Sequence, residues 1–184
     1  MTTNQNIKLI VFSGPPCSGK SHLAEGLSEE MGATYLQMDK IRSILIPDSD
    51  QRKEHRQIAY RAMHFTANLL LRAGHNVILD ATYIPFEHRR EVEQIALAAP
   101  ASLYLVECIV PSEIAVERFK SRDKTHPAVD LTASQVAELA STFPYSGNGL
   151  LLVTTTPAAD CLASIEAYLS REQPVTPGEW SVSK

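Results

Sequence analysis

Residues 13–22, SGPPCSGKSH, follow directly on the apolar run IKLIVF and combine residue types that suit phosphate binding. Gly14 is followed by four residues and then by Gly19, Lys20 and Ser21, which is the spacing G-x-x-x-x-G-K-[ST]. In such a loop backbone N–H groups point at a triphosphate, the lysine reaches its β- and γ-phosphates, and the serine hydroxyl binds Mg²⁺. A plain turn is the alternative, but turns rarely hold both glycines and the Lys-Ser pair. We therefore predict that the nucleotide is bound by Gly14, Pro15, Pro16, Cys17, Ser18, Gly19, Lys20, Ser21 and His22.

An acid and a guanidinium, Asp39 and Arg42, follow in the stretch TYLQMDKIRSIL. Asp39 ends an apolar run, where ligands collect in open α/β sheets, and Arg42 comes three residues later on the same face of a helical turn. The carboxylate can take a proton from an attacking hydroxyl, and the guanidinium can hold a polar or anionic group of the acceptor. The alternative is that Asp39 only caps a helix beginning at Lys40 and that Arg42 is solvated.

A second acid, Asp80, ends the apolar strand of NVILDATYIPFEHRR and should emerge beside the glycine-containing loop. We predict that Asp80 either supports Mg²⁺ together with Ser21 or orients Arg42 through a salt bridge. Thr82 and Arg89 are expected to flank the same crevice and to bind the acceptor.

Two further guanidiniums, Arg118 and Arg122, stand four residues apart in VERFKSRDKTHPAVD and therefore share a helical face. They lead into residues 123–149, which contain two prolines and two glycines and are predicted to be a mobile insertion. The pair could close over the nucleotide and neutralise charge on the transferring phosphoryl group. A solvated basic face is the alternative, because Glu117 and Asp123 lie nearby.

The elements that must position these residues alternate between strands and helices. Strands are predicted at 7–12, 34–38, 76–80, 102–108 and 150–154, and helices at 20–31, about 50–72, 85–98, 111–122 and 158–170. This alternation implies a parallel sheet of five strands with helices on both faces, in one domain over residues 1–171. Residues 172–184, with two prolines and a glycine, are predicted to be a flexible tail.

Composition limits the class of protein further. The 184 residues are 44% hydrophobic and carry a formal net charge of −4, as in an ordinary globular domain with no overall attraction to nucleic acid. The sequence has neither an apolar run of membrane-spanning length nor the pattern of a signal peptide, so we expect a cytoplasmic protein. Its three cysteines, Cys17, Cys108 and Cys161, fit reduced thiols better than disulfides.

The stretches GPPCSGKS, MDKIR, VILDAT and ERFKSR, in this order, resemble the small P-loop kinases of the predicted-kinase group. That group is related to the kinase domain of polynucleotide kinase, to chloramphenicol phosphotransferase and to zeta-toxin kinases. The resemblance covers about residues 7–170. It implies a P-loop NTPase fold of the adenylate-kinase type, a three-layer sandwich with strand order 2-3-1-4-5 and a helical lid at about residues 118–149.

The same resemblance implies roles for individual residues. Lys20 and Ser21 would bind phosphate and Mg²⁺, Asp39 would be the base and Arg42 would hold the acceptor. Arg118 and Arg122 would belong to the lid. The turn that contains Thr156 and Pro157 would lie near the adenine.

We therefore expect an enzyme that uses ATP and Mg²⁺ to phosphorylate a hydroxyl, with Lys20, Asp39, Arg42 and Arg122 as the catalytic residues. The expected acceptor is a small molecule such as a sugar, nucleoside, metabolite or antibiotic, because the chain leaves no separate domain for a macromolecule. A 5′-hydroxyl end of a nucleic acid is the alternative acceptor. An ATP-dependent switch without an acceptor is an alternative of another class.

Overall fold

The computed structural model describes residues 6–47, 52–121 and 131–181. Five parallel strands form one sheet: β1 (Lys8–Ser13), β2 (Thr34–Gln37), β3 (Val77–Asp80), β4 (Ser102–Ile109) and β5 (Leu150–Val153). The helices are α1 (Lys20–Met31), α2 (Met38–Leu45), α3 (Lys53–Arg72), α4 (Phe86–Ala98), α5 (Ser112–Ser121), α6 (Ala133–Ser141) and α7 (Ala158–Ser170). The strand order is β2-β3-β1-β4-β5, which confirms the predicted P-loop NTPase fold.

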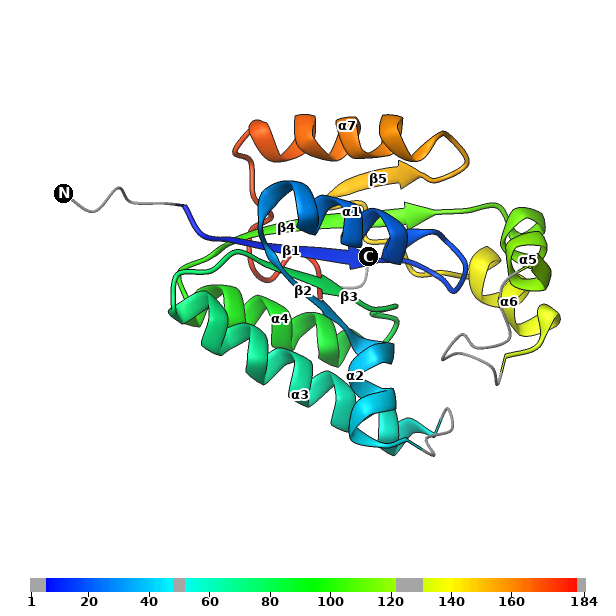
Figure 1. Ribbon diagram of the computed structural model, residues 1–184, viewed down its shortest axis with the longest axis horizontal. Helices are drawn as coiled ribbons and strands as arrows, with labels where there is room; N and C mark the ends of the chain where they lie inside the picture. The colour runs from blue at the N-terminus through cyan, green and yellow to red at the C-terminus, as the bar shows by residue number, and fades with distance from the viewer. Residues whose placement is uncertain (1–5, 48–51, 122–130, 182–184) are drawn as a thin grey trace.

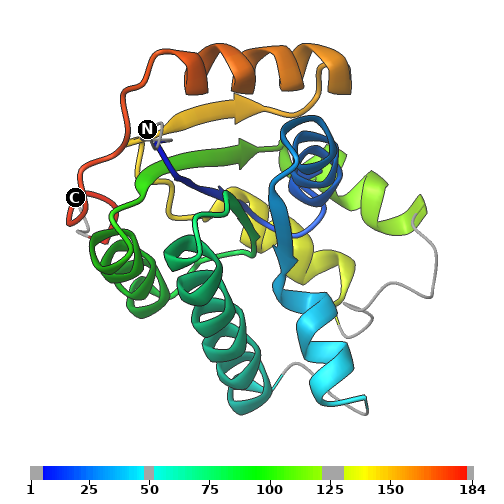
Figure 2. The same ribbon diagram turned by 60° about the vertical axis from the view of Figure 1, so that its left-hand side comes forward.

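Helices cover both faces of the sheet (Figures 1 and 2). Leu9 and Val11 of β1 belong to the core beneath α3 and α4, whereas Ile10 and Phe12 belong to the core beneath α1 and α7. Successive side chains of a strand point to opposite faces, so a strand buried on both sides has to be apolar throughout. This requirement explains the continuous run IKLIVF at the centre of the sheet.

The carboxyl ends of the parallel strands meet at one edge of the sheet, at the right of Figure 1. Phe12 pairs in register with Asp80, and Ser13 pairs with Glu107, so the loops that follow β1, β3 and β4 leave the sheet at the same level. Helices α5 and α6 pack against each other at this edge through a small separate cluster that includes Val110, Ala115 and Val136. The candidate residues that follow these strands therefore come together here.

The predicted strands and helices all occur in the structure, and their ends differ by only a few residues. Two helices add to them. α2 begins at Met38, before the turn expected at Lys40, and α6 lies within the stretch expected to be irregular. The start of α6 is fixed by a capping box, in which the Thr132 hydroxyl accepts from the Gln135 N–H and the Gln135 side chain accepts from the Thr132 N–H.

As far as residue 181, the segment after α7 does not form the flexible tail that the sequence predicts, and residues 182–184 lie outside the described residues. Val175 and Trp180 are buried, and the Val175 N–H donates to the Leu103 carbonyl at 2.7 Å. Glu93 Oε1 accepts hydrogen bonds from three backbone N–H groups of residues 178–181 at 2.8–3.2 Å. A buried carboxylate with three N–H donors and a buried indole hold this segment against the core, and the prolines and glycine only shape its path.

Among the described residues, none of the three cysteines is paired with another in a disulfide. Cys108 and Cys161 are buried, and burial raises the pKa of Cys108 to about 12. Within the described ranges, no helix combines the length and the apolar character needed to cross a bilayer.

Candidate active site

The loop between β1 and α1 depends on its two glycines. A Cβ at Gly14 would lie 2.7 Å from the carbonyl oxygen of Cys108, closer than real Cβ contacts allow. Gly19 has φ of +83° and forms the N-cap of α1, a left-handed conformation that disfavours residues with a side chain. The backbone path of this loop thus requires glycine at both positions of the phosphate-binding pattern.

The loop also leaves polar groups available to a ligand. α1 begins at Lys20, so the positive end of its dipole and its unpaired N–H groups adjoin the loop. The ammonium of Lys20 lies 3.5 Å from the Pro15 carbonyl. Ser18 Oγ is buried and has no hydrogen-bond partner among the described residues. The Lys20 ammonium and the N–H groups at the start of α1 are therefore the groups of this loop that can meet an anion.

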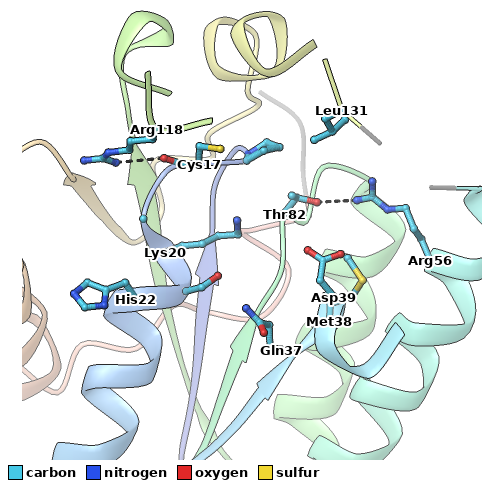
Figure 3. A pocket seen from close by; sticks show the side chains of 13 residues that line it. Cys17, Lys20, His22, Gln37, Met38, Asp39, Arg56, Thr82, Arg118 and Leu131 are labelled. Atoms are coloured by element: carbon cyan, nitrogen blue, oxygen red, sulfur yellow. Dashed lines mark hydrogen bonds between the residues drawn. The ribbon is translucent and has the colours of Figure 1, made fainter. Parts of the chain in front are cut away.

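The loop forms one wall of a cavity of about 260 Å³ (Figure 3). The other wall comes from the start of α2, from α3 and from the residues after β3. The cavity is lined by Pro16, Cys17, Gly19, Lys20, Ser21, His22, Gln37, Met38, Asp39, Arg56, Thr82, Arg118 and Leu131. The structure therefore brings most of the predicted loop residues together with Asp39, Thr82 and Arg118, while Gly14, Pro15 and Ser18 shape the loop without lining the cavity.

Asp39 lies in the first turn of α2, which begins at Met38 after the N-cap Gln37. It is therefore not the N-cap residue of that helix, and the alternative role as a cap is wrong. Its carboxylate is about one-third exposed and lies in the cavity wall. Arg42 Nη2 contacts Asp39 Oδ1 at 3.5 Å from a side chain that is only 2% exposed. Arg42 does not line the cavity, but it contacts Asp39, which does.

Asp80 is buried behind the cavity at the end of β3. Its Oδ2 accepts from the Tyr35 hydroxyl at 2.8 Å and from Gln37 Nε2 at 3.2 Å, and these contacts stand in place of the expected salt bridge with Arg42. Burial and the adjacent Asp80 raise the pKa of Tyr35, which keeps its hydroxyl a donor. Asp80 Oδ1 is buried without a hydrogen-bond partner among the described residues.

The two predicted metal residues fit Mg²⁺. The orphaned Oδ1 of Asp80 could accept from a water in the metal's shell, and the Ser21 hydroxyl lines the cavity at the start of α1. Within the described part of the chain no group of three or more His, Cys, Asp or Glu side chains could cage an ion.

Arg118 joins the phosphate loop to the turn after β5. Its guanidinium donates to the Cys17 carbonyl at 3.3 Å and to the Thr154 carbonyl at 2.5 Å. A second hollow of about 300 Å³ adjoins it, and its wall includes Gly19, His22, Arg118 and Thr156. Thr156, which the resemblance assigns to the adenine site, lines this hollow, while Pro157 is the N-cap of α7 and does not line it.

Arg89 was expected in the crevice, but the structure places it elsewhere. Its side chain is 1% exposed, and it donates to the carbonyls of Tyr83 at 2.7 Å and Pro144 at 2.8 Å. Burial lowers its pKa, and its guanidinium lies over the rings of Phe86 and Trp180 at 5.0 and 5.6 Å. Arg89 therefore joins loops in the interior and does not reach the cavity.

Arg122 lies outside the described residues, so its position relative to the cavity is not defined. The described part of the expected lid is more regular than predicted, because it contains α6 and a loop tied to the core. Glu107, fully buried, accepts from the Ser146 N–H at 2.9 Å and the Gly147 N–H at 2.9 Å. The Tyr145 hydroxyl donates to the Cys108 carbonyl at 3.2 Å. The expectation of one irregular insertion is therefore wrong for residues 131–149.

Comparison with known protein families shows to which family the chain belongs. The family model described as AAA domain (AAA_33) matches residues 9–145, which include β1 except its first residue, β2 to β4 and all the residues that line the cavity. The chain belongs to this AAA-domain family.

Curated relatives of this AAA-domain chain include "Uncharacterized protein Rv2004c" of Mycobacterium tuberculosis (strain H37Rv). The two are 28% identical over an alignment of 147 positions, and the match covers 73% of this chain and 29% of the relative. The chain thus spans under a third of the length of the curated relatives that it matches.

Solved structures share the fold over nearly their whole length. A sugar kinase from Janibacter sp. HTCC2649 has a TM-score of 0.69 and 18% identity, covering 95% of this chain and 98% of that chain. The APS kinase CysC of Mycobacterium tuberculosis, in complex with AMPPNP and APS, has a TM-score of 0.70 and 23% identity, covering 90% and 98%. Together with the family match, they confirm the resemblance to the small P-loop kinases.

Sequence reasoning missed Arg56, which lies in the first turns of α3 and lines the cavity. Its Nη2 donates to Thr82 Oγ1 at 3.1 Å across a separation of 26 residues. No local pattern marks Arg56, because it is one of several basic residues in a polar stretch. Tyr35 and Gln37 were not predicted as site residues either. They are two residues apart on β2, so their side chains lie on the same face of the sheet.

Proposed function

We propose that the protein is an ATP-dependent phosphotransferase that moves the γ-phosphate of ATP to a hydroxyl of a small-molecule acceptor. The observation that carries this proposal is the shared cavity. Lys20 and Ser21 of the phosphate loop and the carboxylate of Asp39 line the same space of about 260 Å³. A loop that holds a phosphate beside a partly exposed acid is the minimal arrangement for transfer to a hydroxyl.

Each residue of the cavity has a task in this reaction. Lys20 and the N–H groups at the start of α1 hold the phosphates and offset the charge that develops during transfer. Asp39 accepts the proton of the acceptor hydroxyl, and Arg42 behind it holds the carboxylate in place. Arg118 lies beside the loop, where its positive charge adds to that of Lys20. Positioning and charge, more than covalent chemistry, supply the rate enhancement.

Ser21 and Asp80 would hold Mg²⁺, which would neutralise charge on the phosphates. Tyr35 and Gln37 orient the Asp80 carboxylate through one oxygen and leave the other for the metal's water.

The size of the cavity favours a small acceptor. At about 260 Å³ it lies just below the usual range for ligand sites, and part of it has to hold the phosphate end of the nucleotide. The sugar kinase and the APS kinase named above act on small molecules, as their names state. A 5′-hydroxyl end of a nucleic acid stays as the alternative acceptor, since the presence of Asp39 and Arg42 together in the sequence suggests it.

The test is a transfer assay with ATP labelled in the γ-phosphate. The full chain is incubated with pools of sugars, nucleosides and hydroxy acids, and separately with oligonucleotides that end in a 5′-hydroxyl. Label that moves to a small molecule, and fails to move with Lys20→Ala, supports the proposal. Label that moves only to oligonucleotides supports the polynucleotide alternative, and label released only as inorganic phosphate at the same rate without acceptors supports an ATPase switch.

A further inference from the structure

The cavity has a cation on the side away from the phosphate loop. Arg56 comes from α3, whereas Lys20 comes from α1 and Arg118 from α5, so its guanidinium belongs to the wall formed by α2 and α3 (Figure 3). Asp39 lines the same wall from the start of α2. An acceptor whose hydroxyl contacts Asp39 therefore has Arg56 as the neighbouring charged group.

The charge of Arg56 is not balanced within the described part of the chain. Its side chain is half-buried, its one side-chain hydrogen bond goes to the neutral hydroxyl of Thr82, and no described acid forms an ion pair with it. Asp39, the carboxylate in the same cavity, is in contact with Arg42 instead. A partly buried guanidinium offers several N–H donors in a planar fork, and a carboxylate or phosphate satisfies two of them at once.

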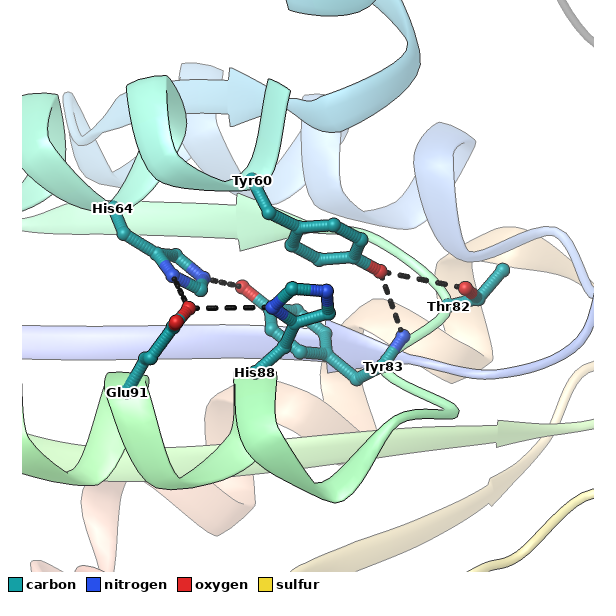
Figure 4. A network of polar contacts seen from close by, with 6 residues as sticks. All are labelled: Tyr60, His64, Thr82, Tyr83, His88 and Glu91. Atoms are coloured by element: carbon teal, nitrogen blue, oxygen red, sulfur yellow. Dashed lines mark hydrogen bonds and ion pairs between the residues drawn. The ribbon is translucent and has the colours of Figure 1, made fainter. Parts of the chain in front are cut away.

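The partner of Arg56 is itself held firmly, as Figure 4 shows. The hydroxyl of Tyr60 lies 3.4 Å from Thr82 Oγ1 and accepts from the Tyr83 N–H at 3.2 Å. Tyr83 has φ of +53°, an unfavourable conformation for a tyrosine, so the turn needs such outside support. The Tyr60 ring in turn stacks on His88 at 3.8 Å between centroids. Arg56 is thus anchored to a rigid turn before any acceptor binds, which lowers the entropy lost on binding.

We propose that Arg56 binds an anionic group of the acceptor, a carboxylate or a phosphate, while Asp39 faces the hydroxyl that is phosphorylated. This inference rests on the proposed function and narrows its acceptor to small hydroxy compounds that carry a negative charge. The sequence assigned the binding of the acceptor to Arg42 of α2, and this proposal assigns it to Arg56 of α3 instead. Arg42 holds the base, and Arg56 holds the substrate.

Binding and transfer are measured separately. The full chain is loaded with Mg²⁺ and AMPPNP, so that the phosphate loop is occupied and added anions cannot bind there. Glycerol, glycerate and glycerol 3-phosphate are then titrated, and so are glucose, gluconate and glucose 6-phosphate, each set differing in charge on a common framework. Dissociation constants come from calorimetry, with the shift in melting temperature as a second readout.

We expect at least one anionic member of the two sets to bind more tightly than its neutral counterpart. Arg56→Gln should weaken that binding by about 10- to 100-fold, the range for a lost charge-assisted hydrogen-bond pair, and Arg56→Lys by less. Affinity for AMPPNP should be unchanged in both variants. Arg61→Gln is the matched control, because Arg61 is an exposed residue of the same helix outside this cavity. The melting temperature of each variant without ligand shows that it is folded.

The transfer arm uses ATP and the same compounds. With an anionic acceptor, Arg56→Gln should raise the acceptor KM by about 10-fold or more and change kcat much less, because a binding cation acts equally on substrate and transition state. A fall in kcat with unchanged KM would instead make Arg56 a transition-state donor and overturn the proposal.

The outcomes separate the two proposals. Four results would each overturn the anion site. Two concern binding: charged and neutral members bind equally, or neither type of anion binds. Two concern transfer: label moves to neutral compounds only, or to oligonucleotide ends only. Anion binding that needs Arg56, without transfer of label to any compound, would support the anion site and count against the phosphotransferase. Preference for the carboxylate or for the phosphate member identifies which anion Arg56 accepts.

Discussion

The two walls of the cavity are built in different ways. The phosphate loop is one continuous segment, residues 14–22, and its shape follows from two glycines and the N-terminus of α1. The acceptor wall consists of single side chains from distant places, among them Asp39, Arg56 and Thr82. Backbone N–H groups serve any triphosphate, so the first wall can stay the same when the substrate changes. Side chains on separate elements can be exchanged one at a time, so in the proposed reaction the second wall would determine the choice of acceptor.

The largest expected effect concerns the loop wall. Lys20→Ala should lower phosphoryl transfer by about 10³- to 10⁵-fold, as when a cation at a transferring phosphoryl group is lost, and should also weaken ATP binding. The melting temperature should not change, because this lysine supports no core. Transfer assays and ATP titration of Lys20→Ala, with the exposed Lys40→Ala as a control, test this. Turnover near that of the wild type would remove the loop from the mechanism.

Asp39→Asn tests the acceptor wall at its chemical centre. The amide keeps the shape of the side chain but cannot take a proton, so single-turnover transfer should fall by about 10²- to 10⁴-fold while ATP affinity stays the same. Asp160→Asn, an exposed change on α7, is the control. If transfer by Asp39→Asn is close to normal, Asp39 is not the base, and the contrast between a general loop and a selective wall loses its main support.

Tyr60→Phe probes the support behind the acceptor wall. The change keeps the stacking on His88 but leaves the buried N–H of Tyr83 without its acceptor, which should cost about 1–3 kcal/mol of the free energy of unfolding. Denaturant unfolding measures this loss, and the acceptor KM should rise a few-fold while the ATP KM does not. Tyr104→Phe is the matched control, since the buried Tyr104 hydroxyl has no partner among the described residues. Equal losses in the two variants would contradict the anchoring role.

The last prediction concerns stability alone, as a pH dependence of the same support. Burial lowers the pKa of His64 from 6.5 to about 4, although Glu91 at 2.8 Å opposes the shift, and His88 and Tyr83 also adjoin the ring. Below pH 6.5 the unfolded chain therefore binds a proton that the folded chain does not, and stability falls as the pH drops toward 4. We therefore expect the free energy of unfolding to be roughly 2 kcal/mol lower at pH 5 than at pH 8.

Urea unfolding at both pH values measures this loss, and His64→Gln should remove that part of the pH dependence. The exposed His75→Gln should leave it intact. A pH dependence that is the same in His64→Gln as in the wild type would show that other groups cause it.

The sequence predicted the loop wall well because its signal is local. The pattern from Gly14 to Ser21 lies within one strand-to-helix connection, and the alternating apolar runs fixed the elements on both sides. Asp39 and Asp80 were found because both stand at strand ends, which meet at one edge of a parallel sheet. In each of these cases the neighbours along the chain are enough to place the residue.

The acceptor wall was predicted less well because its contacts join distant parts of the chain. Arg56 reaches Thr82 from a helix whose rotation depends on the packing of the whole face, and Arg89 is turned inward by the carbonyls of Tyr83 and Pro144. Charge and spacing alone cannot distinguish these two arginines. The helix α6 was different, since Thr132 and Gln135 carry a capping pattern that was open to recognition in the sequence.

The segment around Trp180 bears on the order in which the two walls form during translation. Its indole packs 5.1 Å from the Tyr83 ring, so it adjoins the turn on which Arg56 is anchored. The strands and the helix that frame the phosphate loop, β1, α1, β3 and β4, are all synthesised by residue 109. The phosphate loop can thus assemble on a nascent chain while the acceptor wall still lacks the supporting indole of Trp180. Ribosome-bound chains can be arrested before or after residue 181 has left the exit tunnel. We expect the two to differ in protection of the Tyr83 turn from protease and not in protection of the phosphate loop.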